Sequence, residues 1–169
     1  MGLLFNFRWG ILLGMEVLSI TKFNSYETAE VSILTEQLIN ESSHPVTYNE
    51  ENTLNTLSNY IENGDSDVLV VYNAKGRVLG FALVARTNEG HNEYFGYLVK
   101  FYIAPESRKS RAAVHLMRAV QEWFRHHKCV ACFATATAGI GRDDAFVKLM
   151  KKFKYEEIGP TMMREEKNG

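Results

Sequence analysis

Residues 101–117 read FYIAPESRKSRAAVHLM, and this stretch decides the fold of the chain. Its opening residues, 101–104, are aromatic, β-branched or small and predict a β-strand. The strand is expected to stop at Pro105, because proline cannot donate a hydrogen bond to a sheet. A helix is expected to follow, because Ala113, Leu116 and later apolar residues recur at helical spacing. The stretch therefore predicts a strand, a short turn and an amphipathic helix.

The start of this helix is predicted to bind a phosphate group. Three cations, Arg108, Lys109 and Arg111, are expected in its first turn, beside Ser110 and two alanines. The first turn of a helix presents unpaired backbone N–H groups and the positive end of the helix dipole. Small side chains let a ligand approach these groups, and the cations neutralise it. The alternative interpretation is an ordinary strand, turn and helix whose charged side chains are solvated.

The composition fits one globular domain and argues against a general nucleic-acid-binding protein. With 169 residues, 46% of them hydrophobic, the chain is long enough to bury its own core. Its formal charge of −1 differs from the strongly basic balance typical of nucleic-acid-binding domains. A run of lysines near the C-terminus is expected on a solvated face, and a nucleic-acid-binding role for it stays open: Lys148, Lys151, Lys152 and Lys154.

The two cysteines, Cys129 and Cys132, have the C-x-x-C spacing of redox and metal sites. They fall in a run of small and apolar residues that predicts a buried strand. An odd separation in a strand sends the two side chains to opposite faces of the sheet. They are therefore predicted to be inert core residues, with no metal site. Unpaired cysteines fit a reducing cytoplasm, where the protein is expected to reside.

Residues 1–14 are apolar but differ from a membrane anchor and from a signal peptide. The run is interrupted by Asn6, Arg8 and Gly10, and it is shorter than the roughly 20 apolar residues that span a bilayer. No cleavage pattern of small residues follows it. Because a strand is predicted from Met15, residues 1–14 are interpreted as a leader outside the domain and residues 15–169 as the domain. A peripheral membrane-binding or partner-binding segment is the alternative.

The remaining patterns place further strands and helices along the chain. Strands are predicted at 15–21, 68–72, 77–86, 93–104, 129–137, 155–158 and 161–164, and helices at 26–40, 49–62, 108–127 and 142–153. This order predicts an α+β fold, with a mixed, mostly antiparallel sheet of six or seven strands and one parallel crossover. About four helices are expected to flank the sheet.

The motif and the order of elements together resemble the GNAT superfamily of acyl-CoA N-acyltransferases over about residues 15–166. In that family a strand ends in hydrophobic-x-Pro-Glu, and a helix start of the pattern Gln/Arg-x-x-Gly-x-Gly/Ala follows. Positions 108–113 read RKSRAA, so Arg108 and Ala113 fit the pattern, whereas Arg111 stands where the family usually has glycine. The resemblance implies an acetyl-CoA-dependent N-acetyltransferase that transfers the acetyl group directly to a primary amine.

The resemblance also implies how acetyl-CoA, the co-substrate, is held. The pantetheine arm would lie between the strand that ends at Pro105 and the strand of Cys129, and it would pair with backbone groups of Phe101 and Ile103. A free backbone N–H in this region would polarise the thioester carbonyl. The Arg108 side chain is expected to add a charge-assisted contact with the pyrophosphate. The pyrophosphate would also accept hydrogen bonds from five amides, those of Lys109, Ser110, Arg111, Ala113 and Val114.

The catalytic residues that the resemblance implies are matched less well. The family often places a glutamate general base at the position of Tyr97, and Glu93 is expected on the same strand face because strand side chains alternate. Either residue is expected to relay a proton through water, and Tyr97 has a second interpretation as an aromatic wall of the substrate pocket. Where the family commonly has a proton-donating tyrosine, this chain has Met150. Two alternatives remain for protonation of the departing thiolate. Tyr102 or Tyr155 could be a substitute acid, or solvent could supply the proton.

The sequence leaves the acceptor and the alternatives open. The acceptor is expected to be a small-molecule or peptide amine, and no motif specifies which one. No membrane partner is expected, and exposed final strands would allow a homodimer. The departures at Arg111 and Met150 keep a second hypothesis open, a non-catalytic CoA-binding or protein-interaction module of the same fold.

Overall fold

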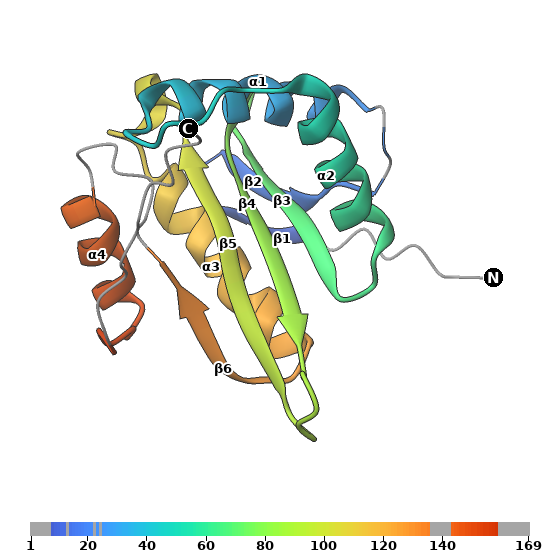
Figure 1. Ribbon diagram of the computed structural model, residues 1–169. Coiled ribbons are helices and arrows are strands. Elements are labelled where there is room, and N and C mark those ends of the chain that lie inside the picture. Colours follow the sequence, from blue (N-terminus) through green and yellow to red (C-terminus); the bar gives the residue numbers. More distant parts are fainter. Residues whose placement is uncertain (1–7, 13, 22, 24, 136–142, 159–169) are drawn as a thin grey trace.

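A computed structural model describes residues 8–12, 14–21, 23, 25–135 and 143–158. They form a mixed α+β domain in which helices cover both faces of one sheet (Figure 1). The strands are β1 (Arg8–Leu12), β2 (Met15–Ser19), β3 (Ser66–Tyr72), β4 (Val78–Thr87), β5 (Tyr94–Ile103) and β6 (Cys129–Ala134). The helices are α1 (Tyr26–Glu41), α2 (Glu50–Glu62), the short 3-10 helix η1 (Pro105–Ser107), α3 (Ala112–His126) and α4 (Asp143–Lys152).

The described strands lie across the sheet in chain order, from β1 to β6. Each neighbouring pair from β1–β2 to β4–β5 is antiparallel, whereas β5 and β6 are parallel. A parallel pair needs a long connection, and α3 supplies it. The predicted α+β class with a mixed sheet, one parallel crossover and four flanking α-helices is therefore confirmed.

Two apolar cores hold the helices to opposite faces of the sheet. On one face α3 packs through residues such as Phe124, with α4 beside it. On the other face α1 and α2 pack through residues that include Val31 and Leu57. Successive strand residues alternate between the two cores, as Val70 and Val71 show, and neither side chain is exposed. Within the described ranges, no helix has both the length and the apolar character of a membrane span.

Part of the expected leader belongs to the sheet. Residues 8–12 form β1 and pair with β2, although residues 1–14 were expected outside the domain. Without this partner β2 would leave a row of unpaired backbone groups at the edge of the sheet. Gly14 lies between the two strands with a φ of 73°, a conformation that glycine adopts without strain.

The C-terminal segment differs from the expected hairpin. Residues 155–158 form no strand in the structure, so this prediction is wrong, and the strand expected at 161–164 lies outside the described residues. The chain turns after α4 through Lys154, which has a φ of 64°. The Tyr155 N–H then donates to the Met150 carbonyl at 3.1 Å, which ties the segment back to the helix. The homodimer expected from exposed final strands stays a prediction.

Candidate functional site

The turn between β5 and α3 is closed by two serines. The Ser110 hydroxyl donates to the Ser107 carbonyl at 2.6 Å and accepts from the Ala112 N–H at 3.1 Å. A serine side chain that bonds to nearby backbone in this way stabilises a turn in competition with a helix. The helix therefore begins only at Ala112. The prediction that the cations of residues 108–111 lie in the first helical turn is wrong, because they lie in the turn that precedes α3.

Four of the five amides expected to hold the pyrophosphate have no acceptor within the described part of the protein. They are the N–H groups of Lys109, Arg111, Ala113 and Val114. The fifth, from Ser110, donates to the Ser107 carbonyl at 3.0 Å and is not free as expected. Such unpaired N–H groups, together with the positive end of the α3 dipole, favour an anion at this position.

The side chain of Arg108 links the turn to α1. Its Nε donates to the Ile103 carbonyl at 3.0 Å, and its Nη2 donates to Glu41 Oε2 at 2.7 Å. The guanidinium also lies 5.3 Å from the centroid of the Tyr102 ring. The Tyr102 hydroxyl donates to the other Glu41 oxygen at 2.5 Å. The Arg108 side chain is thus bonded within the protein, whereas a contact with the pyrophosphate was expected.

The second half of β5 has an edge that no described strand covers. Pairing with β6 ends at Leu98 and Ala134, whereas β5 continues to Ile103. The Ala104 N–H donates to a carbonyl of β4 at 2.9 Å. Because backbone groups alternate between the two sides of a strand, those of Phe101 and Ile103 point away from β4. The Ile103 carbonyl already accepts from Arg108, so an extended ligand can pair with the backbone groups of Phe101 and with the Ile103 N–H.

A β-bulge lies where β5 and β6 separate. In the pairing with β4, Val84 lies opposite Leu98 and Leu83 lies opposite Lys100, so that Val99 is an extra residue. The extra residue of a bulge is left out of the ladder. The bulge therefore supplies an unpaired backbone group beside the uncovered edge, in the region where a donor to the thioester carbonyl was expected.

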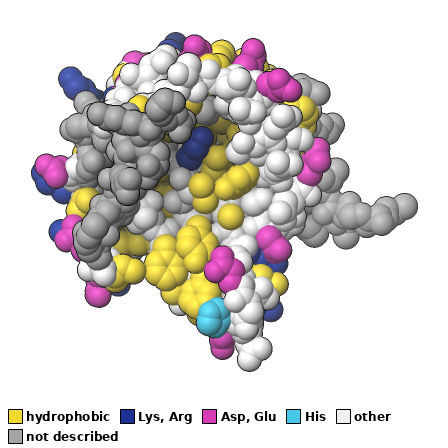
Figure 2. All heavy atoms as spheres, in the orientation of Figure 1, with side chains coloured by type: hydrophobic (Ala, Val, Ile, Leu, Met, Phe, Trp, Pro, Cys, Tyr) yellow, Lys and Arg dark blue, Asp and Glu magenta, His cyan; other side chains and the backbone are white. Residues whose placement is uncertain are grey.

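An aromatic cluster lies beside this bulge, on the face of the sheet that α1 and α2 cover. The rings of Tyr97 and Phe133 are stacked, with centroids 5.5 Å apart and an interplanar angle of 26°. Phe95 lies 6.2 Å from Phe133. Figure 2 shows hydrophobic side chains gathered beside a hollow in this surface. Glu93 precedes β5 and is exposed, so the structure places the two candidate bases in different surroundings.

None of the candidate acids is well suited to donate a proton. Met150, which stands at the family's usual acid position, has no proton to donate; it is only 6% exposed and packs in the core under α3. Burial, reinforced by the bonded Glu41 carboxylate, raises the pKa of Tyr102 above its ordinary value. Burial likewise raises the pKa of Tyr155. A higher pKa makes each phenol a weaker acid than an ordinary tyrosine.

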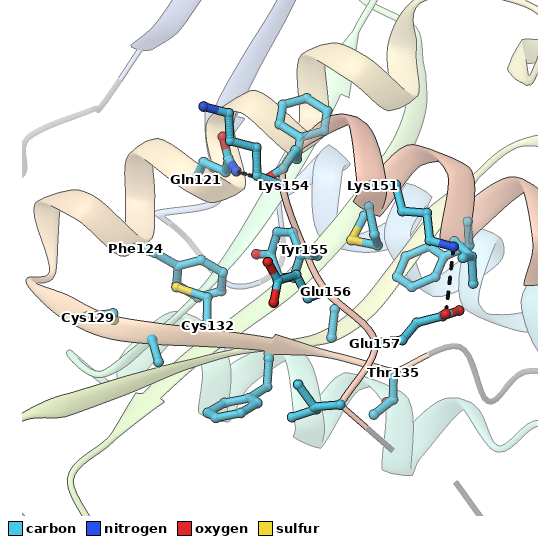
Figure 3. A pocket seen from close by; sticks show the side chains of 18 of the residues that line it. Gln121, Phe124, Cys129, Cys132, Thr135, Lys151, Lys154, Tyr155, Glu156 and Glu157 are labelled. Carbon is cyan, nitrogen blue, oxygen red and sulfur yellow. Dashed lines mark hydrogen bonds and ion pairs between the residues drawn. The ribbon is translucent and has the colours of Figure 1, made fainter. Parts of the chain in front are cut away.

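A cavity of about 1140 Å³ lies away from the turn before α3. It opens between the C-terminal half of α3, β6, α4 and residues 155–158 (Figure 3). Phe124 and Tyr155 line it, and the Lys151 ammonium lies 3.7 Å from a Glu157 carboxylate oxygen at its rim. No group of three or more His, Cys, Asp or Glu side chains that could hold a metal occurs among the described residues.

Both cysteines line this cavity, so the prediction that they face opposite sides of the sheet is wrong. The cause is a second bulge, because Cys129 lies opposite Tyr94 whereas Ala131 lies opposite the next residue of β5. The thiols are free. Burial raises the pKa of Cys129, and it raises the pKa of Cys132 to about 11. A raised pKa lowers the fraction of nucleophilic thiolate at neutral pH.

Three residues that the structure brings to this region were missed from the sequence: Phe133, Glu41, and Lys100, which lies on the same sheet face as Tyr97. Lys100 carried a signal, because it is a charged residue inside an otherwise aromatic and apolar strand. Phe133 was included only in the predicted strand of the cysteines. Glu41 carried no signal, because its partner Arg108 lies 67 residues away in the chain.

Comparisons with known proteins place the chain in a family. The model of the acetyltransferase (GNAT) family matches residues 33–149. Among solved structures, the aminoglycoside acetyltransferase AAC(6')-Iy in complex with the bisubstrate analogue CoA-S-monomethyl-acetylneamine is 16% identical, with a TM-score of 0.71 over 90% of this chain and 98% of that chain. The aminoglycoside acetyltransferase meta-AAC0020, from an uncultured soil metagenomic sample and in complex with sisomicin, is 10% identical, with a TM-score of 0.69 over 91% and 97%.

A GNAT family acetyltransferase of Staphylococcus aureus is 13% identical, with a TM-score of 0.67 over 91% of this chain and all of that chain. A search among curated protein sequences found no match. At these identities the likeness to solved structures shows the fold alone. The family model, by contrast, covers more than half of the sequence and includes the whole stretch from β5 to α3. The chain belongs to the GNAT family of acetyltransferases.

Proposed function

We propose that the protein moves the acetyl group of acetyl-CoA directly to a primary amine. The observation that carries this proposal is a set of four amides in the turn before α3 and in its first residues that have no acceptor among the described residues, those of Lys109, Arg111, Ala113 and Val114. They suit a pyrophosphate, and the uncovered edge of β5 beside them suits an extended pantetheine arm. Family membership supports acetyl transfer, and CoA is bound in a structure of the neighbour AAC(6')-Iy.

The transfer requires that the thioester be held beside the amine. In the proposed geometry, backbone groups of Phe101 and Ile103 fix the pantetheine arm along β5. The bulge at Val99 supplies a backbone donor for the thioester carbonyl oxygen, which gains negative charge during the attack. The amine nitrogen attacks the carbonyl carbon, the C–N bond forms, and the C–S bond breaks. The nitrogen loses its proton to water, and the departing thiolate takes one from solvent.

Tyr97 and Glu93 stay the candidate residues for the proton relay. The stack with Phe133 supports Tyr97 as a wall of the acceptor site, and the exposure of Glu93 allows water to connect its carboxylate to the amine. Tyr97→Phe keeps the ring and removes the hydroxyl. It is therefore expected to preserve kcat if Tyr97 is a wall, and to lower kcat with a changed pH profile if Tyr97 relays the proton. Steady-state rates over a pH series distinguish these roles.

A second candidate function is favoured by Met150. Met150 stands at the family's usual acid position, has no hydroxyl and is buried in the core. This fits a module that binds CoA without turnover. A thiol has an ordinary pKa of about 8.5 and leaves without help, so the missing acid is expected to slow the reaction and not to abolish it.

Two measurements separate the candidates. Isothermal titration measures CoA binding, and release of free thiol from acetyl-CoA over a panel of primary amines measures turnover. An acetyltransferase shows both, whereas a non-catalytic module binds CoA and releases no thiol with any amine. The absence of CoA binding would contradict both candidates. The neighbours in complex with aminoglycosides support small-molecule amines as the first members of the panel.

A further inference from the structure

Lys100 is a half-buried lysine on the same face of the sheet as Tyr97. Lys100 lies opposite Leu83, which packs into the core under α1 and α2, so its side chain points to that face. Tyr97 lies opposite Ala85, two residues further along β4. Side chains three positions apart normally point to opposite faces, and the bulge at Val99 brings these two together. We call the face formed by Lys100, Tyr97 and Phe133 the acceptor face.

The ammonium group of Lys100 has no counterion among the described residues. The described ion pairs and side-chain hydrogen bonds all involve other groups. Burial lowers the pKa of Lys100, which indicates that water solvates the charged form incompletely. A partly desolvated cation without a partner is unfavourable, and an anion from outside the described protein would relieve this cost.

The surroundings of Lys100 indicate the rest of the ligand. Tyr97, Phe133 and Phe95 present stacked and tilted aromatic rings, which bury apolar or aromatic groups favourably. A polycationic acceptor would place positive charge beside the unpaired ammonium, and like charges at close range are destabilising. The acceptor face therefore complements a ligand with an apolar body and a negative charge.

We propose that the acceptor amine carries a carboxylate that pairs with Lys100 and an aromatic or apolar body that packs against Tyr97 and Phe133. The inference rests on the proposed acetyl transfer and names the class of its acceptor. It separates this protein from enzymes whose acceptors are polycations, although their fold is the same.

The test compares two amines that differ only in charge. 4-(Aminomethyl)benzoate and 4-(aminomethyl)benzamide share a ring and an amine, and only the first carries a carboxylate. Their affinities are measured by isothermal titration into the protein saturated with CoA, and their kcat/KM values with acetyl-CoA. The benzoate is expected to bind about 10- to 100-fold more tightly, as a charge-assisted hydrogen bond contributes.

Single substitutions test whether the Lys100 side chain causes the preference for the benzoate. Lys100→Met keeps the length of the side chain and is expected to abolish the preference without changing the dissociation constant of CoA. Lys100→Arg is expected to retain most of the preference. Lys75→Met, which removes an exposed lysine in the β3–β4 turn, is expected to retain all of it. Thermal melts confirm that each variant is folded.

The outcomes distinguish the inference from the proposed function. Equal affinity for the two amines, no measurable binding of either, or a preference that survives in Lys100→Met overturns the inference. A weaker affinity of Lys100→Met for CoA also overturns it, because Lys100 would then belong to the co-substrate site. If CoA itself does not bind, the proposed function fails, and the inference fails with it.

Discussion

Glu41 is the residue that holds the turn before α3 against α1. Its two carboxylate oxygens accept from Tyr102 and Arg108 at 2.5 and 2.7 Å. Arg108 in turn donates to the Ile103 carbonyl at the edge of β5. Glu41 itself contacts neither the unpaired amides nor the uncovered edge of β5, yet it positions both through Arg108. Its contribution is therefore expected in CoA affinity, through Arg108.

Glu41→Gln is expected to raise the dissociation constant of CoA about tenfold, because it weakens a charge-assisted hydrogen bond that orders the turn. A direct electrostatic effect has the opposite sign, since removal of a carboxylate near a diphosphate strengthens binding. Isothermal titration of CoA measures the change, and Glu36→Gln, on the exposed side of α1, is the control. Tighter binding in Glu41→Gln would show that Glu41 only repels the ligand.

Asp67 is a buried carboxylate that makes stability depend on pH. It accepts from the Ser19 hydroxyl at 2.8 Å and from the Trp123 indole at 3.2 Å. Burial, opposed by these bonds, raises its pKa from 3.8 to about 6. Between these two values the folded protein holds a proton that the unfolded chain has lost. This contribution is therefore full at low pH and is lost as the pH rises from about 4 through 6, by about 3 kcal/mol in total.

Asp67→Asn removes the titrating group. The free energy of unfolding of the variant is expected to lack the decline that the native protein shows between about pH 4 and pH 6. Urea unfolding at several pH values measures the slope in each protein. Glu36→Gln, which removes an exposed carboxylate, is expected to keep the native slope. An equal slope in Asp67→Asn and the native protein would mean that Asp67 does not titrate in this range.

Close contact between α3 and β5 sets the position of the helix that carries the free amides. A Cβ atom added at Gly96 would lie 2.5 Å from a ring carbon of Phe124. The Phe124 side chain is 2% exposed and has little room to move. Glycine is thus required here for the helix to approach the strand.

Gly96→Ala is expected to destabilise the protein by roughly 1–3 kcal/mol, as overpacking of a core does. Chemical denaturation measures this loss. Gly64→Ala is the matched control, because a Cβ there meets no atom within 4 Å. Similar effects of the two substitutions would contradict the close packing of α3 on β5.

The two bulges decide which strand residues meet, and neither was predictable from the sequence. Simple alternation places Cys129 and Cys132 on opposite faces, and it does the same for Tyr97 and Lys100. The bulges at Val99 and in β6 reverse both assignments. A bulge depends on the register with the neighbouring strand, which the local pattern of a single strand does not contain.

For the molecule as a whole, the sequence predicted what local patterns and the signature motif determine. The start of α1, predicted at residue 26, is confirmed, and Ser25 caps it, with its hydroxyl accepting from the Thr28 N–H at 3.3 Å. The GNAT family, predicted from residues 101–117, is confirmed. The bond between Glu41 and Arg108 and the pairing of β1 with β2 depend on contacts between distant parts of the chain. No local pattern predicted them.

The central claim is that amides in the turn before α3 and in its first residues hold the pyrophosphate of CoA. Titration of ¹⁵N-labelled protein with CoA, followed in amide ¹H–¹⁵N spectra, tests it most directly. The amide protons of Lys109, Arg111, Ala113 and Val114 are expected to shift downfield and to saturate together, because each gains a charged acceptor. The Ser110 amide, which already donates to Ser107, is expected to shift less. If CoA binds and leaves these four signals unchanged, the account is contradicted.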